Sequence, residues 1–158
     1  MKKTVIIAIL IIYLASILAV NFFGLQMVVS SPTVYVEEIK MNGITLERTE
    51  EQGSLETFAV PNDDGYMSYR FYFVNGNWSL DNVDSNPNVV KLNYEVLPEG
   101  ANQKDVDIVY AQEDAVNIVV RAEEGEIVFL KRATVKITLV SKDGSLVKTS
   151  FWVSARRG

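Results

Sequence analysis

Residues 133–153, ATVKITLVSKDGSLVKTSFWV, contain two runs of alternating apolar and polar residues on either side of a Lys-Asp-Gly turn. Successive side chains of a β-strand point to opposite faces of its sheet, so a period of two is typical of a strand with one buried face. The apolar positions form the predicted inward set: Val135, Ile137, Leu139, Val147, Phe151 and Val153. The stretch therefore predicts a β-hairpin.

The chain upstream of this hairpin repeats the same pattern in short segments that are separated by turn residues. We expect strands within residues 33–39, 44–46, 56–60, 66–74, 89–97, 106–111, 116–121 and 126–130. Asn42-Gly43 is expected to form a turn, and Asn75-Gly76 is the dipeptide that best suits a tight type I′ hairpin turn. Many short strands at regular spacing predict an all-β fold, an antiparallel sandwich.

Residues 89–154 resemble the bacterial Ig-like repeats of group 2, the invasin and intimin type. The resemblance rests on a strand that ends in proline before an Ala-Asn turn, an acidic bend, a glycine hairpin and an "AT-x-I-T"-like strand. These features lie at residues 97–104, 110–115, 124–125 and 133–138. Two positions depart from the family pattern: Tyr110 is the nearest aromatic to the family's tryptophan, and Lys131-Arg132 replaces a glycine.

The resemblance implies an antiparallel Ig-like β-sandwich with its first strand within residues 33–46. Residues 50–88 would then be an insertion that carries an extra hairpin. The family consists of structural and adhesive modules of surface proteins, and it offers no catalytic residues to transfer.

Residues 4–25, TVIIAILIIYLASILAVNFFGL, form a nearly unbroken apolar run without a charge. A helix from Val5 to Leu25 would be about 32 Å long, which matches a hydrocarbon core of about 30 Å. We therefore expect a single transmembrane helix in the lipid bilayer. Its expected anchor residues are Val5, Leu10, Leu14, Leu18, Phe22 and Phe23.

Lys2 and Lys3 precede this run, which predicts a cytoplasmic N-terminus for a single-pass protein of the cell membrane. Residues 1–32 would be the anchor and residues 33–158 an extracytoplasmic domain. The alternative is a cleaved signal peptide, which has a shorter apolar region and small residues at positions −3 and −1. Cleavage after Ala15 or Ala19 would place Tyr13 or Ile17 at −3, so we favour an uncleaved anchor.

The composition of residues 33–158 limits the chemistry of the domain. The chain contains no His and no Cys, which excludes a Ser-His-Asp triad and the usual zinc sites. All 20 acidic residues lie in this region, whereas two of the 15 basic residues are Lys2 and Lys3, so its net charge is −7. This charge disfavours binding to nucleic acid. We expect no enzyme activity and no cofactor.

Two groups of residues are candidate binding sites. Tyr66, Arg70 and Tyr72 share one face of an aromatic strand, and with Trp78 they are expected to stack on sugar rings or anchor a protein partner. The alternative is that the aromatic residues belong to the core and to the cover of a sheet edge. Asp81 and Asp84 lie in an acidic loop whose oxygen ligands suit calcium, although such loops are more often simple turns.

These observations predict a membrane-anchored, surface-exposed and non-enzymatic Ig-like module with a binding or structural role. Its partner would be an unknown protein or a polysaccharide. One alternative is an accessory subunit of a membrane protein complex, because only about seven residues separate the apolar run from the first strand. The other is a domain that binds polysaccharide or the cell wall.

Overall fold

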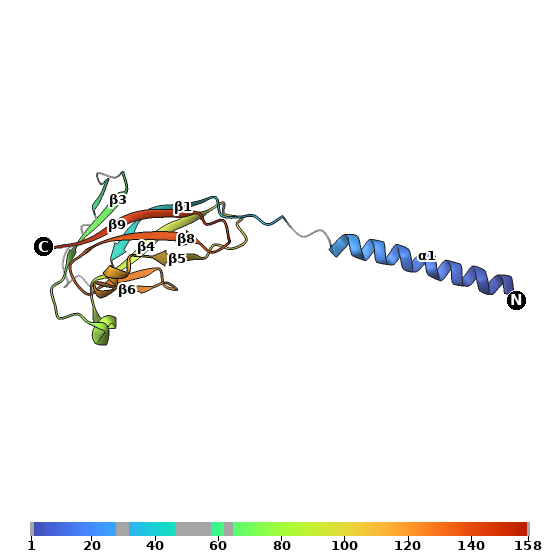
Figure 1. The fold of residues 1–158 in the computed structure, drawn as a ribbon, viewed down its shortest axis with the longest axis horizontal. Coiled ribbons are helices and arrows are strands. Elements are labelled where there is room, and N and C mark those ends of the chain that lie inside the picture. Colours follow the sequence, from blue (N-terminus) through green and yellow to red (C-terminus); the bar gives the residue numbers. More distant parts are fainter. Residues whose placement is uncertain (1, 28–31, 47–57, 62–64, 158) are drawn as a thin grey trace. The chain divides into compact units, whose positions relative to one another are not determined.

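The computed structural model describes residues 2–27, 32–46, 58–61 and 65–157. The chain divides into two compact units, residues 1–33 and residues 34–158 (Figure 1). The predicted loop at residues 47–55 lies outside the described residues, as does part of the expected insertion at residues 50–88.

The first unit contains one α-helix, α1 (Lys2–Met27). Its large apolar side chains are exposed wherever they are described, from Val5 and Leu10 to Leu14 and Leu18. The side chains of Phe22 and Phe23 lie outside the described residues. The side chains of α1 are described only as far as residue 21. Among the described residues, no helix is long and apolar enough to cross a membrane.

The second unit is a sandwich of two β-sheets, as the alternating patterns predicted. The four-stranded antiparallel sheet has the order β1-β4-β7-β6, formed by Glu38–Leu46, Val89–Leu97, Glu126–Phe129 and Ile118–Arg121. The five-stranded sheet has the order β2-β3-β9-β8-β5, formed by Phe58–Pro61, Met67–Phe73, Lys148–Arg157, Thr134–Ser141 and Val106–Val109. The 3₁₀ helices η2 (Leu80–Ser85) and η3 (Gln112–Val116) lie in the connections that the structure describes.

The C-terminal hairpin is confirmed. β8 and β9 pair antiparallel with Val135 opposite Val153 and Ile137 opposite Phe151. All four of these side chains are buried, as is Leu139. Gly144 in the connecting turn has a φ of +90°, a conformation that glycine adopts without the strain a Cβ would cause. The period of two thus predicted both the strands and their buried face.

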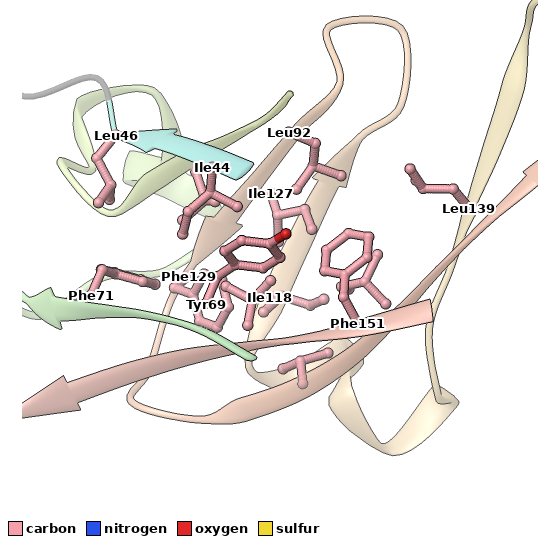
Figure 2. Close-up of a cluster of buried hydrophobic side chains, with 14 of the residues drawn as sticks. Ile44, Leu46, Tyr69, Phe71, Leu92, Ile118, Ile127, Phe129, Leu139 and Phe151 are labelled. Carbon is pink, nitrogen blue, oxygen red and sulfur yellow. The ribbon is translucent and has the colours of Figure 1, made fainter. Parts of the chain in front are cut away.

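The core lies between the inward faces of the two sheets (Figure 2). Phe71 of β3 and Phe129 of β7 meet edge to face across the sandwich, with ring centroids 5.1 Å apart. Tyr69 and Phe151, on the neighbouring strands β3 and β9, make a similar contact at 5.8 Å. Buried aromatic rings contribute large apolar areas, so the Phe71–Phe129 contact helps to hold the two sheets together, whereas the Tyr69–Phe151 contact packs two strands of one sheet.

The prediction of a purely antiparallel sandwich was wrong for β3. This strand runs parallel to β9, with Ser68 opposite Trp152 and Phe73 opposite Arg157, so the five-stranded sheet is mixed. Asn75-Gly76 does not form the predicted hairpin turn. The indole of Trp78 packs against Gly76 and its Nε1 donates to the carbonyl of Val74 at 2.9 Å. The chain then crosses to the other sheet, where β4 begins.

The predicted turn at Asn42-Gly43 was also wrong. β1 continues through both residues, and its register with β4 shifts between Met41 and Gly43. Such a shift is a β-bulge, in which one strand has an extra residue and bends. Gly43 has a φ of +146°, which explains why glycine suits this position. The dipeptide therefore bends a strand and does not end it.

Candidate functional site

The outer face of the five-stranded sheet holds most of the residues predicted to bind a ligand. Tyr69, Phe71 and Phe73 point into the core, so the alternate residues of β3 point outward. We define the outer basic face as the outward positions of the three central strands β3, β9 and β8. These are Ser68, Arg70, Tyr72, Thr134, Lys136, Thr138, Val140, Lys148, Ser150, Trp152, Ser154 and Arg156.

A hollow of about 490 Å³ opens on this face. Among the described residues it is lined by Val60, Arg70, Phe71, Tyr72 and Arg156. In the parallel pair of β3 and β9, Tyr72 lies directly opposite Arg156. Arg70 lies two residues earlier on β3, opposite Ser154. The volume falls within the range of about 300–1,000 Å³ that is typical of small-ligand sites. The pairing of β3 with β9 therefore brings two arginines and one tyrosine to a single concave site.

The charge of the outer basic face is opposite to that of the domain. Its positions include Arg70, Lys136, Lys148 and Arg156 and no Asp or Glu. Within the described part of the chain, no carboxylate forms a salt bridge with either arginine. The nearby strand β5 carries Asp107, but this carboxylate is paired with Lys142 at 2.9 Å. A domain with a net charge of −7 thus keeps a positive face that attracts anions.

Two N–H donors beneath this face have no acceptor in the described part of the chain. They are Nε of Arg70 and Nε1 of Trp152, and both atoms are buried without a hydrogen-bond partner among the described residues. Trp152 lies between Ser68 of β3 and Lys136 of β8. Most buried polar groups in native proteins are paired, so an unpaired donor calls for an explanation such as a ligand or an ordered water.

Two aromatic rings complete the site. Tyr72 is 39% exposed and Tyr66 is 40% exposed. Nζ of Lys136 lies 4.5 Å from the centroid of the Tyr66 ring, which is the geometry of a cation–π contact. Tyr66, Arg70 and Tyr72 therefore lie in or beside the outer basic face, as the sequence predicted.

Trp78 does not join them. Its indole is half-buried against the core and is fixed by Gly76 and by the carbonyl of Val74, so it packs as part of the loop after β3. Sequence reasoning also missed Lys136, Trp152 and Arg156. Their strands follow β3 by many residues, and no local pattern indicated that β9 would pair with β3.

The predicted calcium ligands lie in η2. Arg121 of β6 forms an ion pair with the carboxylate of Asp84, whereas Asp81 is exposed. Across residues 2–27, 32–46, 58–61 and 65–157, no group of three or more acidic side chains is placed to hold a metal ion. The guanidinium of Arg121 also lies 3.8 Å from the carboxylate of Glu124 and 3.6 Å from that of Glu126, so Asp84 shares it with two other acidic side chains.

Comparison with known proteins adds no relative from which a role could be transferred. The chain matches no protein-family model and no curated protein sequence. The function of the outer basic face therefore has to be inferred from its own residues, chiefly the two arginines, the exposed rings and the two buried donors.

Proposed function

We propose that this chain is a membrane-anchored, non-enzymatic Ig-like module that presents the outer basic face to a partner outside the cell membrane. The observation that carries the proposal is the apolar helix α1 ahead of a self-contained sandwich. Large apolar side chains occupy every side of α1, and those described are exposed, up to 71% for Val20. A helix that is hydrophobic all round needs an apolar environment, which lipid supplies.

The strand order supports the Ig-like part of the proposal. An Ig sandwich of the constant type has one sheet with the order A-B-E-D and another with strands C, F and G. The order β1-β4-β7-β6 corresponds to A-B-E-D, and β9-β8-β5 corresponds to G-F-C. In this assignment, β2 and β3 are the additional hairpin expected within residues 50–88, and they extend the second sheet beyond β9.

A binding or structural role fits the residue types better than catalysis does. The chain has no His or Cys, and the described residues that line the hollow are arginine, aromatic and apolar residues without a carboxylate. General acid–base chemistry needs a group that takes and gives a proton near neutral pH, which arginine does not do.

One further observation favours an accessory subunit of a membrane complex as the setting of this module. Hydrogen bonds of the sandwich extend back to Val34, whose carbonyl accepts from N–H of Asn102 at 3.0 Å. N–H of Val36 then donates to the carboxylate of Asp143. The hydrogen bonds of the sandwich therefore extend to within seven residues of Met27, the last residue of α1, and so short a link in the sequence suits a module that works beside a membrane protein.

Carbonate extraction of membranes tests the anchor. We expect the wild-type chain to stay in the membrane pellet, because carbonate removes peripheral proteins and leaves integral ones. Leu10→Arg combined with Leu14→Arg should release the chain, since each charge at a helix centre costs about 2.5–3.5 kcal/mol on insertion scales. Leu80→Arg and Leu146→Arg together are the matched control, because both leucines are exposed on the sandwich. Release of the wild-type chain by carbonate would refute the anchor.

Purification of the chain from its native membranes in mild detergent tests the accessory role. Stoichiometric co-purification of the same membrane proteins in repeated preparations is the expected result for a subunit of a complex. Recovery of the chain alone after chemical cross-linking would count against that setting.

A further inference from the structure

We infer that the outer basic face binds an acidic polysaccharide, with the hollow receiving the anionic group of one sugar unit. This inference rests on the proposed function, because it names the class of partner for the module that we have described. Four features of the face carry it: the two arginines of the hollow, the buried donors, the rings and the hydroxyl pairs.

The arginines determine the charge of the ligand. Guanidinium groups present several N–H donors in a planar fork that matches a carboxylate or a phosphate. Arg70 and Arg156 line one hollow, and neither forms a salt bridge with a carboxylate among the described residues. Lys136 and Lys148 extend the positive charge along β8 and β9. An anionic group is therefore the complementary occupant.

The remaining side chains indicate a sugar. The exposed Tyr72 ring at the hollow offers an apolar surface beside polar groups, which suits a sugar with its C–H face and its hydroxyl groups. Hydroxyl pairs cross the same face, Thr134 with Ser154 at 2.7 Å and Thr138 with Ser150 at 2.9 Å. The donors of Arg70 and Trp152 have no partner among the described residues and are buried, so side-chain movement that exposes them would let them donate to sugar oxygens.

The hollow lies at one end of the sandwich, and its shape suits a polymer with projecting substituents. Within the sandwich, β9 begins at Lys148, just after the Asp143 turn that binds Val36, and it ends beyond Arg156. At about 3.3 Å per residue, Arg156 lies about 26 Å along the strand from Lys148. The hollow thus lies toward the end of the sandwich that is opposite to where the chain enters. A concave site with recessed donors also suits a projecting sugar substituent better than a flat layer of headgroups.

Affinity measurements on the full-length chain in detergent micelles test this inference. The probes are polygalacturonate as a carboxylate polymer, poly(glycerol phosphate) as a phosphate polymer without sugar rings, and dextran as a neutral polymer. We expect polygalacturonate to bind at least about tenfold more tightly than dextran, equivalent to about 1.4 kcal/mol or more. Poly(glycerol phosphate) should bind more weakly than polygalacturonate because it offers no ring to Tyr72.

Variants localise the binding. Arg70→Gln with Arg156→Gln should weaken binding to polygalacturonate at least about tenfold. Lys40→Gln with Lys104→Gln removes the same charge from exposed positions away from this face, and its affinity should stay within about twofold of the wild type. Trp152→Phe keeps an aromatic ring and loses the donor, so it should weaken binding without changing the circular dichroism spectrum. Arg156→Gln alone serves if the double variant does not fold.

Three outcomes would overturn the inference. The first is equal affinity for polygalacturonate and dextran, or no binding of either. The second is an equal loss in the arginine pair and the lysine pair, which would indicate a diffuse charge effect. The third is binding only to vesicles that contain phosphatidylglycerol, which would assign the face to lipid. Carbonate extraction is independent of these measurements, so the anchor can stand if polysaccharide binding fails.

Discussion

The side chain of Asn88 binds the backbone of Val74 through both of its polar groups. Its Oδ1 accepts from N–H of Val74 at 2.8 Å, and its Nδ2 donates to the carbonyl of Val74 at 3.1 Å. Asn88 is fully buried, and its own carbonyl accepts from N–H of Phe129 at 3.0 Å. Asn88 therefore gives Val74, the residue after β3, the two backbone hydrogen bonds that a neighbouring strand would give. Through Phe129 it also connects the end of β3 to β7 in the other sheet.

Replacement of Asn88 by alanine should destabilise the sandwich strongly. The change leaves the N–H of the half-buried Val74 without its side-chain acceptor and removes the buried bond from Nδ2 of Asn88 to Oδ1 of Asn86, so we expect a loss of about 2–4 kcal/mol in the free energy of unfolding. Urea unfolding followed by circular dichroism measures this loss. Asn93→Ala is the control, because Asn93 is exposed and its side chain donates to the hydroxyl of Thr45, so its cost should stay below about 1 kcal/mol. Equal costs would contradict the structural role of Asn88.

Gly76→Ala should displace Trp78. A Cβ at Gly76 would lie 2.5 Å from Cε2 of the Trp78 indole, closer than any real contact, so the ring must move and lose its bond to Val74. We expect a loss of about 1–3 kcal/mol in the free energy of unfolding. In a Trp152→Phe background, the fluorescence of Trp78 should also shift to the red.

Gly100→Ala is the matched control for Gly76→Ala. A Cβ at Gly100 would meet no atom within 4 Å, so stability and fluorescence should remain close to those of the parent protein. If Gly76→Ala behaved like Gly100→Ala, the indole would not be packed against Gly76.

The stability of the sandwich should fall with acid as Asp143 is protonated. Burial alone would raise the pKa of Asp143, but hydrogen bonds from Ser145, Val36 and Ser141 outweigh it and lower the pKa to about 2, from a usual value of 3.8. A carboxyl with a lower pKa in the folded state binds protons more readily when unfolded. Its stabilising contribution is therefore complete above about pH 4 and is lost as the pH falls toward 2.

Thermal unfolding between pH 6 and pH 2 measures this effect with Asp143→Asn as the variant. The variant should be less stable than the wild type near pH 6, and the difference should shrink as the pH approaches 2. Glu99→Gln, which changes an exposed carboxyl at the same end of the sandwich, should leave the pH profile nearly unchanged. Parallel profiles for wild type and Asp143→Asn would contradict the assigned hydrogen bonds.

Calcium should not stabilise the η2 loop. Asp84 is paired with Arg121, and among the described residues no group of three acidic side chains is placed to hold a metal ion, so millimolar calcium should leave the thermal midpoint of the wild type within about 1 °C of its value in EDTA. A larger rise that Asp84→Asn and Asp81→Asn abolish would instead support the calcium site suggested by the acidic loop. Magnesium at the same concentration controls for ionic strength.

Sequence patterns located most of the strands because each pattern is local. Residues 89–97 form β4 as predicted, and the inward residues of β8 and β9 are those in phase with Val135 and Phe151. The turn dipeptides were less informative. Glycine permits a positive φ in a turn and in a bulge alike, so Asn42-Gly43 could not distinguish the two. Residues 116–121 were predicted as one strand, but η3 ends at Val116 and β6 begins at Ile118.

The sequence alone determined the two-faced strands, the apolar N-terminal run, the missing His and Cys and the negative charge of the domain, because all of these depend on residue type and short spacing. Only the tertiary structure decided that no hairpin turn follows β3 at Asn75-Gly76 and that β3 pairs in parallel with β9. The side chains of Trp78 and Asn88 bond the backbone of Val74 just after β3, where the chain leaves for the other sheet. Strand partners are chosen by such contacts between distant residues, which is why Arg70 and Arg156 share one hollow and no local pattern reveals it.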